Sequence, residues 1–153
     1  LHRSAAERNQ NPYDKFTTSN FMMRRSTFLC ILFDKDCHAY GYEDALFGVE
    51  LKKRAISSQH IDNPLLHMGL DTNERFIEKS EQALRILRQL NGKMEHHSRV
   101  GKAYLKFQRF RATWLLQCTY TAFGSAMRRN LLSAHPSLFL FSIYKLCYYA
   151  HLK

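Results

Sequence analysis

The cysteines of this chain include no C-x-x-C pair, although four are present: Cys30, Cys37, Cys118 and Cys147. Zinc sites and redox-active disulfides usually show that short spacing, so the sequence predicts neither. Free, mostly buried thiols in a reducing compartment are the interpretation that we favour.

Long apolar runs are missing as well. No stretch of about 20 apolar residues is free of charge, so we expect no segment to cross a bilayer as a simple helix. The sequence begins with Leu1 and has no signal-peptide layout of basic, apolar and small-residue segments. We therefore expect a processed or truncated chain. Internal repeats and low-complexity segments are also absent from the sequence.

Carboxylates are scarce, with 13 Asp and Glu against 23 Lys and Arg, which gives a net charge of +10. This charge predicts an acidic partner, either nucleic acid, an anionic membrane face or a phosphorylated ligand. The 153 residues, 45% hydrophobic and 24% charged, are enough for one globular core. The same composition excludes a disordered tail, a collagen-like rod and a coiled coil.

Hydrophobic patterning predicts a small strand-containing N-terminal part followed by helices. Residues 16–25 are rich in β-branched and aromatic side chains and predict a strand, whereas the apolar run 26–33 could be helix or strand. Residues 56–70 should be extended around Asn63-Pro64, because a residue before proline avoids the helical region. Helices are predicted from Tyr42, after the capping residues 71–74, from about Arg99, and over residues 138–150.

Two adjacent carboxylates, Glu43 and Asp44, follow Gly41 and begin the helix predicted from Tyr42. A helix N-terminus stabilises a carboxylate in its charged form, which keeps a general base ready at neutral pH. Helix capping alone is the alternative for an isolated Glu-Asp pair.

The surrounding motifs give this pair a context. They are Asn20, Arg24-Arg25, Phe28, Phe33-Asp34, Gly41-Glu43-Asp44 and His67, in this order. Over residues 11–70 the chain resembles the second half of bacterial family 2 glycosyltransferases with the GT-A fold, of the type found in Bacteroides. The resemblance implies an α/β fold in which a few short strands precede a helical region. It places the C-terminal half of the catalytic domain at 1–72 and a helical extension at 73–153.

The resemblance also implies the chemistry. Asp44 would act as general base on the acceptor hydroxyl in an inverting transfer, and Glu43 would help to position the acceptor. Asn20, Gly41 and Tyr42 would bind substrate. The partners would be a nucleotide-sugar donor and a saccharide or lipid-linked acceptor, in surface polysaccharide or lipopolysaccharide synthesis in the cytoplasm.

A divalent metal, Mn²⁺ or Mg²⁺, is expected in the full-length enzyme to neutralise the leaving diphosphate. His67 falls where some GT-A enzymes place a third metal ligand; a partly buried histidine hydrogen-bonded at a strand end is the alternative. No Asp-x-Asp follows an apolar strand, and neither a P-loop nor G-x-G-x-x-G occurs. We therefore expect a fragment that binds no metal and is inactive alone. The competing hypothesis is a basic helical interaction protein that binds nucleic acid or a large assembly, without catalysis.

Two aromatic segments complete the expectations. The side chains of Tyr104, Phe107, Phe110 and Trp114 recur at helical spacing and predict one buried face, with a ligand platform as the alternative. The segment from about Arg128 to Lys153 is expected to hold the enzyme at the inner, cytoplasmic face of the plasma membrane without crossing it. Its helix over residues 138–150 would place Phe139, Ile143, Leu146 and Tyr149 or Ala150 in the lipid interface, or could simply pack on the core. Nucleic acid ranks below the membrane surface, because no nucleic-acid module is recognisable.

Overall fold

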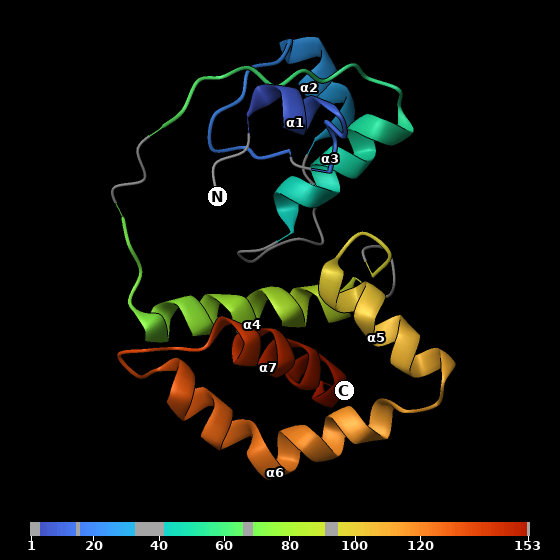
Figure 1. Cartoon of the computed structure of the whole chain (residues 1–153). Helices are drawn as coiled ribbons and strands as arrows, with labels where there is room; N and C mark the ends of the chain where they lie inside the picture. The colour runs from blue at the N-terminus through green and yellow to red at the C-terminus, as the bar shows by residue number, and fades with distance from the viewer. Residues whose placement is uncertain (1–3, 15, 33–41, 66–68, 91–94, 153) are drawn as a thin grey trace. The chain divides into compact units, whose positions relative to one another are not determined.

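The computed structural model describes residues 4–14, 16–32, 42–65, 69–90 and 95–152. Every regular element in these ranges is an α-helix, and the ranges hold no strand (Figure 1). The expected α/β fold is therefore wrong for the described part of the chain. The chain divides into two compact units, the first made of described residues up to Leu70 and the second beginning at Asp71.

The strand expected over residues 16–25 is replaced by turns and irregular chain, which run into helix α2 (Arg25–Ile31). The aromatic side chains of residues 16–25 pack on a helix instead of lining a strand of a sheet. The Phe16 ring stacks on Phe47 with centroids 5.3 Å apart, and Phe21 meets Phe16 edge-on at 5.6 Å. A strand needs a neighbouring strand for its backbone hydrogen bonds, and the described residues offer none.

Three helices make up the first unit: α1 (Ala5–Asn9), α2 (Arg25–Ile31) and α3 (Glu43–Lys53). The ambiguous run 26–33 thus begins as helix, and the helix predicted from Tyr42 is confirmed. A Cβ added to Gly48 on α3 would lie 2.4 Å from the carbonyl oxygen of Tyr13. Only glycine lets α3 approach this backbone so closely.

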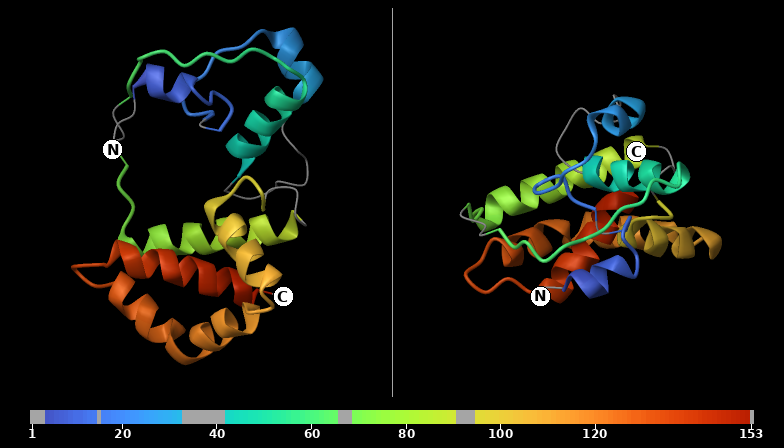
Figure 2. Two further views of the ribbon diagram at one scale, coloured as in Figure 1. Left: turned by 45° about the vertical axis from the view of Figure 1, so that its right-hand side comes forward. Right: turned by 90° about the horizontal axis from the view of Figure 1, so that it is seen from above.

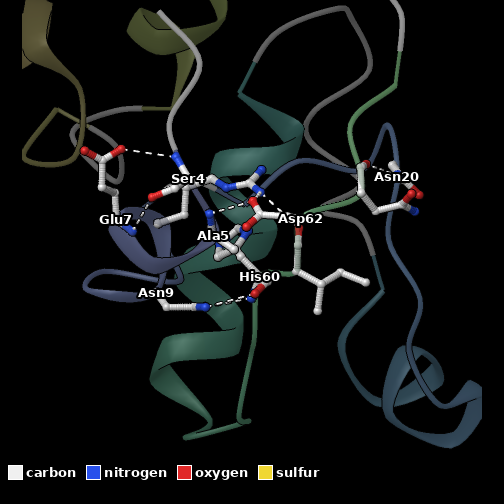
Figure 3. A network of polar contacts seen from close by, with 10 residues as sticks. Ser4, Ala5, Glu7, Asn9, Asn20, His60 and Asp62 are labelled. Carbon is white, nitrogen blue, oxygen red and sulfur yellow. Dashed lines mark hydrogen bonds and ion pairs between the residues drawn. The ribbon is translucent and has the colours of Figure 1, made fainter.

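The non-helical segment 56–65 is held to the N-terminal residues by hydrogen bonds that involve side chains (Figure 3). The Asp62 carboxylate accepts from the backbone N–H of Ala5 at 2.8 Å. Asn9 exchanges two hydrogen bonds with the backbone of His60, at 2.7 and 2.9 Å. These contacts do for this segment what strand pairing does in a sheet, since they satisfy backbone groups that would otherwise bond only to water.

The second unit contains α4 (Asn73–Gln89), α5 (Arg99–Arg109), α6 (Thr113–Leu131) and α7 (Leu138–His151). The side chains of Thr72, Ser98 and Ser137 cap α4, α5 and α7 by accepting from backbone N–H groups in the first turn. The predicted helices at α4, α5 and α7 are confirmed. The break between α5 and α6 was not predicted.

Helix α7 is the centre of the second unit, packed against α4, α5 and α6 (Figures 1 and 2). Its Tyr144, Cys147, Tyr149 and Ala150 are at most 1% exposed. Ile77 of α4, Met127 and Leu131 of α6 and Tyr144 of α7 form the buried cluster. A helix that is apolar on most sides is buried on most sides, which explains why this aromatic helix lies inside the unit.

The expectation of mostly buried thiols is confirmed for Cys147 and wrong for Cys30 and Cys118, which are both exposed. Burial raises the pKa of the Cys147 thiol above its ordinary value. Cys37 lies outside the described residues.

Candidate functional site

The Glu43-Asp44 pair lies in the first turn of α3, as the sequence predicts. Tyr42 precedes it with φ of 62°, a left-handed conformation that turns the chain sharply into the helix. Tyr42, Glu43 and Asp44 are all half-buried. Leu46, Phe47 and Leu51 are buried on the same helix and fix its position, so the two carboxylates lie at the start of an anchored element.

The carboxylate of Asp44 is held by a hydroxyl from another segment. Thr18 Oγ1 donates to Asp44 Oδ1 at 2.5 Å. A hydrogen bond from a hydroxyl to a carboxylate is short and about twice as strong as one between neutral groups. Among the described residues, Thr18 is the hydrogen-bond donor that fixes this carboxylate, and the bond is to one of its two oxygens. The Thr18 bond does not involve the second oxygen of Asp44.

Asn20 lies two residues beyond Thr18 and is exposed. Its amide Nδ2 donates to the carbonyl oxygen of Asn63 at 3.1 Å (Figure 3). The structure thus ties the segment around Thr18 to α3 through Asp44 and to the segment 56–65 through Asn20. It does not record a direct hydrogen bond between the predicted site residues Asn20 and Asp44.

Two predicted site residues, Gly41 and His67, lie outside the described residues, as does Asp34. Within the described ranges, no three His, Cys, Asp or Glu side chains are grouped as metal ligands would be. The ring nitrogen Nε2 of His60 forms a hydrogen bond of 2.9 Å with the carbonyl oxygen of Pro12. This histidine therefore has a structural role.

The sequence does not single out Thr18, because the β-branched Thr-Thr pair at 17–18 favours a strand. A threonine next to a glutamate–aspartate motif in space carries no sequence signal when 26 residues separate the two.

A second polar cluster, which the sequence also did not reveal, lies inside the second unit. The Tyr144 hydroxyl donates to Glu81 Oε1 at 2.6 Å, and Arg85 and Arg128 lie 3.7 and 3.8 Å from the same carboxylate. Burial and this hydrogen bond raise the pKa of Tyr144 above its ordinary value. The phenol therefore stays protonated and acts as a structural donor between α7 and α4.

The pair Tyr149 and Glu95 repeats this arrangement. The Tyr149 hydroxyl donates to Glu95 Oε1 at 2.5 Å, and burial raises the pKa of this phenol too. The guanidinium of Arg88 lies over the rings of Tyr104 and Tyr149, 5.2 and 5.3 Å from their centroids. Both clusters hold helices together, and we assign no chemistry to them.

The aromatic face predicted over residues 104–114 is split by the break between α5 and α6. Tyr104 is 7% exposed and belongs to the core, as predicted. Phe110 and Trp114 are 78% and 58% exposed, so their assignment to the core is wrong. The cause is Arg111, whose φ of 52° ends the continuous helix that the spacing assumed.

The expected lipid-facing set on residues 138–150 is wrong for Tyr149 and Ala150, which are buried, whereas Phe139 is 76% exposed. Ile143 and Leu146 are half-buried. Packing on the core, the alternative, is what the structure shows for α7. Among the described helices, none is both long enough and apolar enough for a membrane span.

No protein-family model, curated protein or solved structure matches this chain. The resemblance to glycosyltransferases therefore depends on the motifs in residues 11–70 alone.

Proposed function

We propose that this chain supplies the general base, and part of the acceptor site, of an inverting glycosyltransferase that uses a nucleotide-sugar donor. One observation carries the proposal: the Thr18 hydroxyl holds one carboxylate oxygen of Asp44 at the start of α3. The motif residues that the structure describes all belong to the first unit: Asn20, Arg24, Arg25, Phe28, Glu43 and Asp44. The proposal does not require a sheet within this chain.

The reaction needs one proton acceptor. The acceptor hydroxyl transfers its proton to Asp44 while its oxygen attacks the anomeric carbon from the face opposite the nucleotide. The bond between that carbon and the diphosphate oxygen breaks, and its electron pair leaves with the nucleoside diphosphate. A positioned carboxylate within hydrogen-bond reach contributes about a hundredfold or more to such a step.

Thr18 holds the base in this scheme. Its hydroxyl fixes one oxygen of Asp44, so the rotation of the carboxylate is restricted before the acceptor binds. Tyr42 and Glu43 lie next to Asp44 in the chain and are half-buried, which suits them to contact the acceptor. Asn20 would bind the substrate from the neighbouring segment.

The described residues do not fit a divalent metal site, since no three ligand side chains are grouped among them. The proposed reaction steps therefore involve no metal held by these residues. Because the donor is a nucleotide sugar made in the cytoplasm, we propose that compartment for the reaction.

The test is transfer by the protein encoded by the whole reading frame that contains these residues. Purified protein is given a panel of nucleotide sugars and saccharide acceptors, and nucleoside diphosphate release and product are measured. Asp44→Asn should lower kcat about a hundredfold or more and leave donor binding unchanged, because an amide cannot take the proton.

Glu50→Gln is the matched control. Glu50 is a carboxylate on the same helix that pairs with Lys53 and Arg54, and the variant should keep wild-type kcat. Retention of more than about a third of turnover by Asp44→Asn, under chemistry-limited conditions, would show that Asp44 is not the base.

A further inference from the structure

The turn between α5 and α6 exposes large apolar side chains. Phe110, Trp114 and Leu115 are 78%, 58% and 44% exposed. The turn is closed by backbone hydrogen bonds from Arg111 to Gln108 and from Ala112 to Phe107, at 3.0 and 2.9 Å. We call residues 106–115 the α5–α6 corner. The corner thus combines a hydrogen-bonded turn with exposed apolar side chains.

The exposed face of α6 extends this corner. The buried residues of α6 are Leu116, Gly124, Met127 and Leu131, which face α7 and the core. The positions on the opposite side recur at helical spacing and are all exposed: Trp114, Leu115, Cys118, Thr121, Ala122, Ser125, Ala126 and Arg129. This face carries no carboxylate and only one charge, a cation at its end.

The α5–α6 corner also carries exposed cationic side chains. Lys106, Arg109 and Arg111 are exposed within it. The sequence from His96 to Lys153 contains no Asp or Glu at all, whereas it contains these basic residues: Arg99, Lys102, Lys106, Arg109, Arg111, Arg128, Arg129, Lys145 and Lys153. A surface with this charge attracts an anionic partner.

We propose that the α5–α6 corner and the exposed face of α6 dock the second unit on an anionic membrane surface. Aromatic and aliphatic side chains would enter the region between head groups and acyl chains, and the cations would contact lipid phosphates. Trp favours this depth because its ring is apolar and carries a polar N–H, and Phe and Leu are typical of the apolar face of interfacial helices.

The observations favour lipid over the other possible occupants. A second copy related by a two-fold axis would bring the cations against themselves, because such an interface pairs the same patch on both subunits. Single-stranded nucleic acid can stack on Phe110 and Trp114. A nucleic acid strand would, however, leave Leu115, Ala122 and Ala126 of the same exposed face without an apolar partner. Acyl chains would cover these three side chains.

Trp114 provides a direct measurement, because it is the one tryptophan in the chain. The intact chain is titrated with vesicles of phosphatidylcholine alone and with 30% phosphatidylglycerol, and tryptophan emission is recorded. With anionic vesicles, we expect the emission to shift to shorter wavelength and brominated acyl chains to quench it. Salt should weaken the binding, because exposed charges are screened.

Charge variants test the corner itself. Lys106→Gln with Arg109→Gln should weaken vesicle binding about thirtyfold, since each cation near the surface contributes about fivefold. The matched control is Lys52→Gln with Lys53→Gln on α3, because it removes the same charge from the last turn of another helix. The control should weaken binding no more than a few fold.

An apolar pair is tested by co-sedimentation. Phe110→Ser with Trp114→Ser should abolish sedimentation with anionic vesicles, whereas Met22→Ser with Leu70→Ser should not, although Met22 and Leu70 are even more exposed. Circular dichroism at 222 nm confirms that each variant keeps its helices.

Four results would overturn the proposal. They are no binding to anionic vesicles, binding without a change in Trp114 emission, equal loss in the corner and control variants, and a corner that binds a 30-nucleotide single strand or a second copy but not vesicles. The measurements use neither donor nor acceptor, so they are independent of the proposed glycosyl transfer.

Discussion

The hydrogen bond between Tyr144 and Glu81 should contribute strongly to the stability of the second unit. Tyr144 is 1% exposed and the Glu81 side chain 14%, so water cannot replace the phenol when it is removed. Tyr144→Phe keeps the ring and deletes the donor. Hydrogen bonds to a charged group contribute about 1.5–3 kcal/mol, and we expect a loss of about 2 kcal/mol in the free energy of unfolding.

The size of the loss depends on what remains around the carboxylate. Arg85 and Arg128 still lie 3.7 and 3.8 Å from it, but both are substantially exposed and exposed ion pairs contribute little. They should reduce the penalty without removing it. For a unit of this size, about 2 kcal/mol corresponds to a fall in Tm of about 8–16 °C.

The assay is urea unfolding of the whole chain, followed by circular dichroism at 222 nm. Tyr13→Phe is the control: its hydroxyl donates to the neutral carbonyl of Ile56 in the first unit, at 3.1 Å, and its loss should cost about 1 kcal/mol or less. Glu81→Gln and the double variant complete a cycle whose coupling energy should be about 1 kcal/mol or more. A Tyr144→Phe loss below about 0.5 kcal/mol would refute the reasoning.

Gly101→Ala should destabilise the chain in urea unfolding although alanine is the better helix former, because the added Cβ would lie 2.3 Å from the carbonyl oxygen of Glu95; Gly69→Ala, with nothing near its Cβ, is the control. Alkaline pH should destabilise the fold, since the raised pKa values of Tyr144 and Tyr149 give stability that is full below the ordinary tyrosine value of 10.0 and is lost above it. Replacing both tyrosines by Phe should flatten that pH dependence in thermal melts. Thr18→Val should lower kcat of glycosyl transfer about tenfold, while Thr18→Ser, which keeps the hydroxyl, should not; equal rates in the two variants would contradict the positioning role.

Local signals in the sequence predicted α3, α4, α5 and α7, but not α1 or a separate α6. Charge placement at the two ends of α3 and the polar residues before α4 are properties of a few neighbouring residues, and the structure confirms both helices. The prediction of a strand over residues 16–25 is wrong, because β-propensity describes single residues and does not say which segment they will pack against. Phe16 and Phe21 found Phe47 rather than another strand.

The candidate site was predictable in part for the same reason. Asp44 and Glu43 form a local motif at a helix start, and the structure places them there. Thr18 comes from a distant segment, and its bond to Asp44 required the fold. Phe110 and Trp114 were misassigned because the break at Arg111 contains no glycine, the residue that most often takes a positive φ, and no proline, the residue that most often ends a helix.

The central position of α7 has a consequence for synthesis on the ribosome. Helices α4, α5 and α6 precede α7 in the chain, so they are made before the helix that they surround. Until α7 emerges, Ile77, Met127 and Leu131 lack the partner against which they are buried. Nascent chains with such unpaired apolar surface are prone to aggregate and to bind chaperones. The second unit should therefore fold in one late step, when α7 with Tyr144 has been synthesised and packs against α4, α5 and α6.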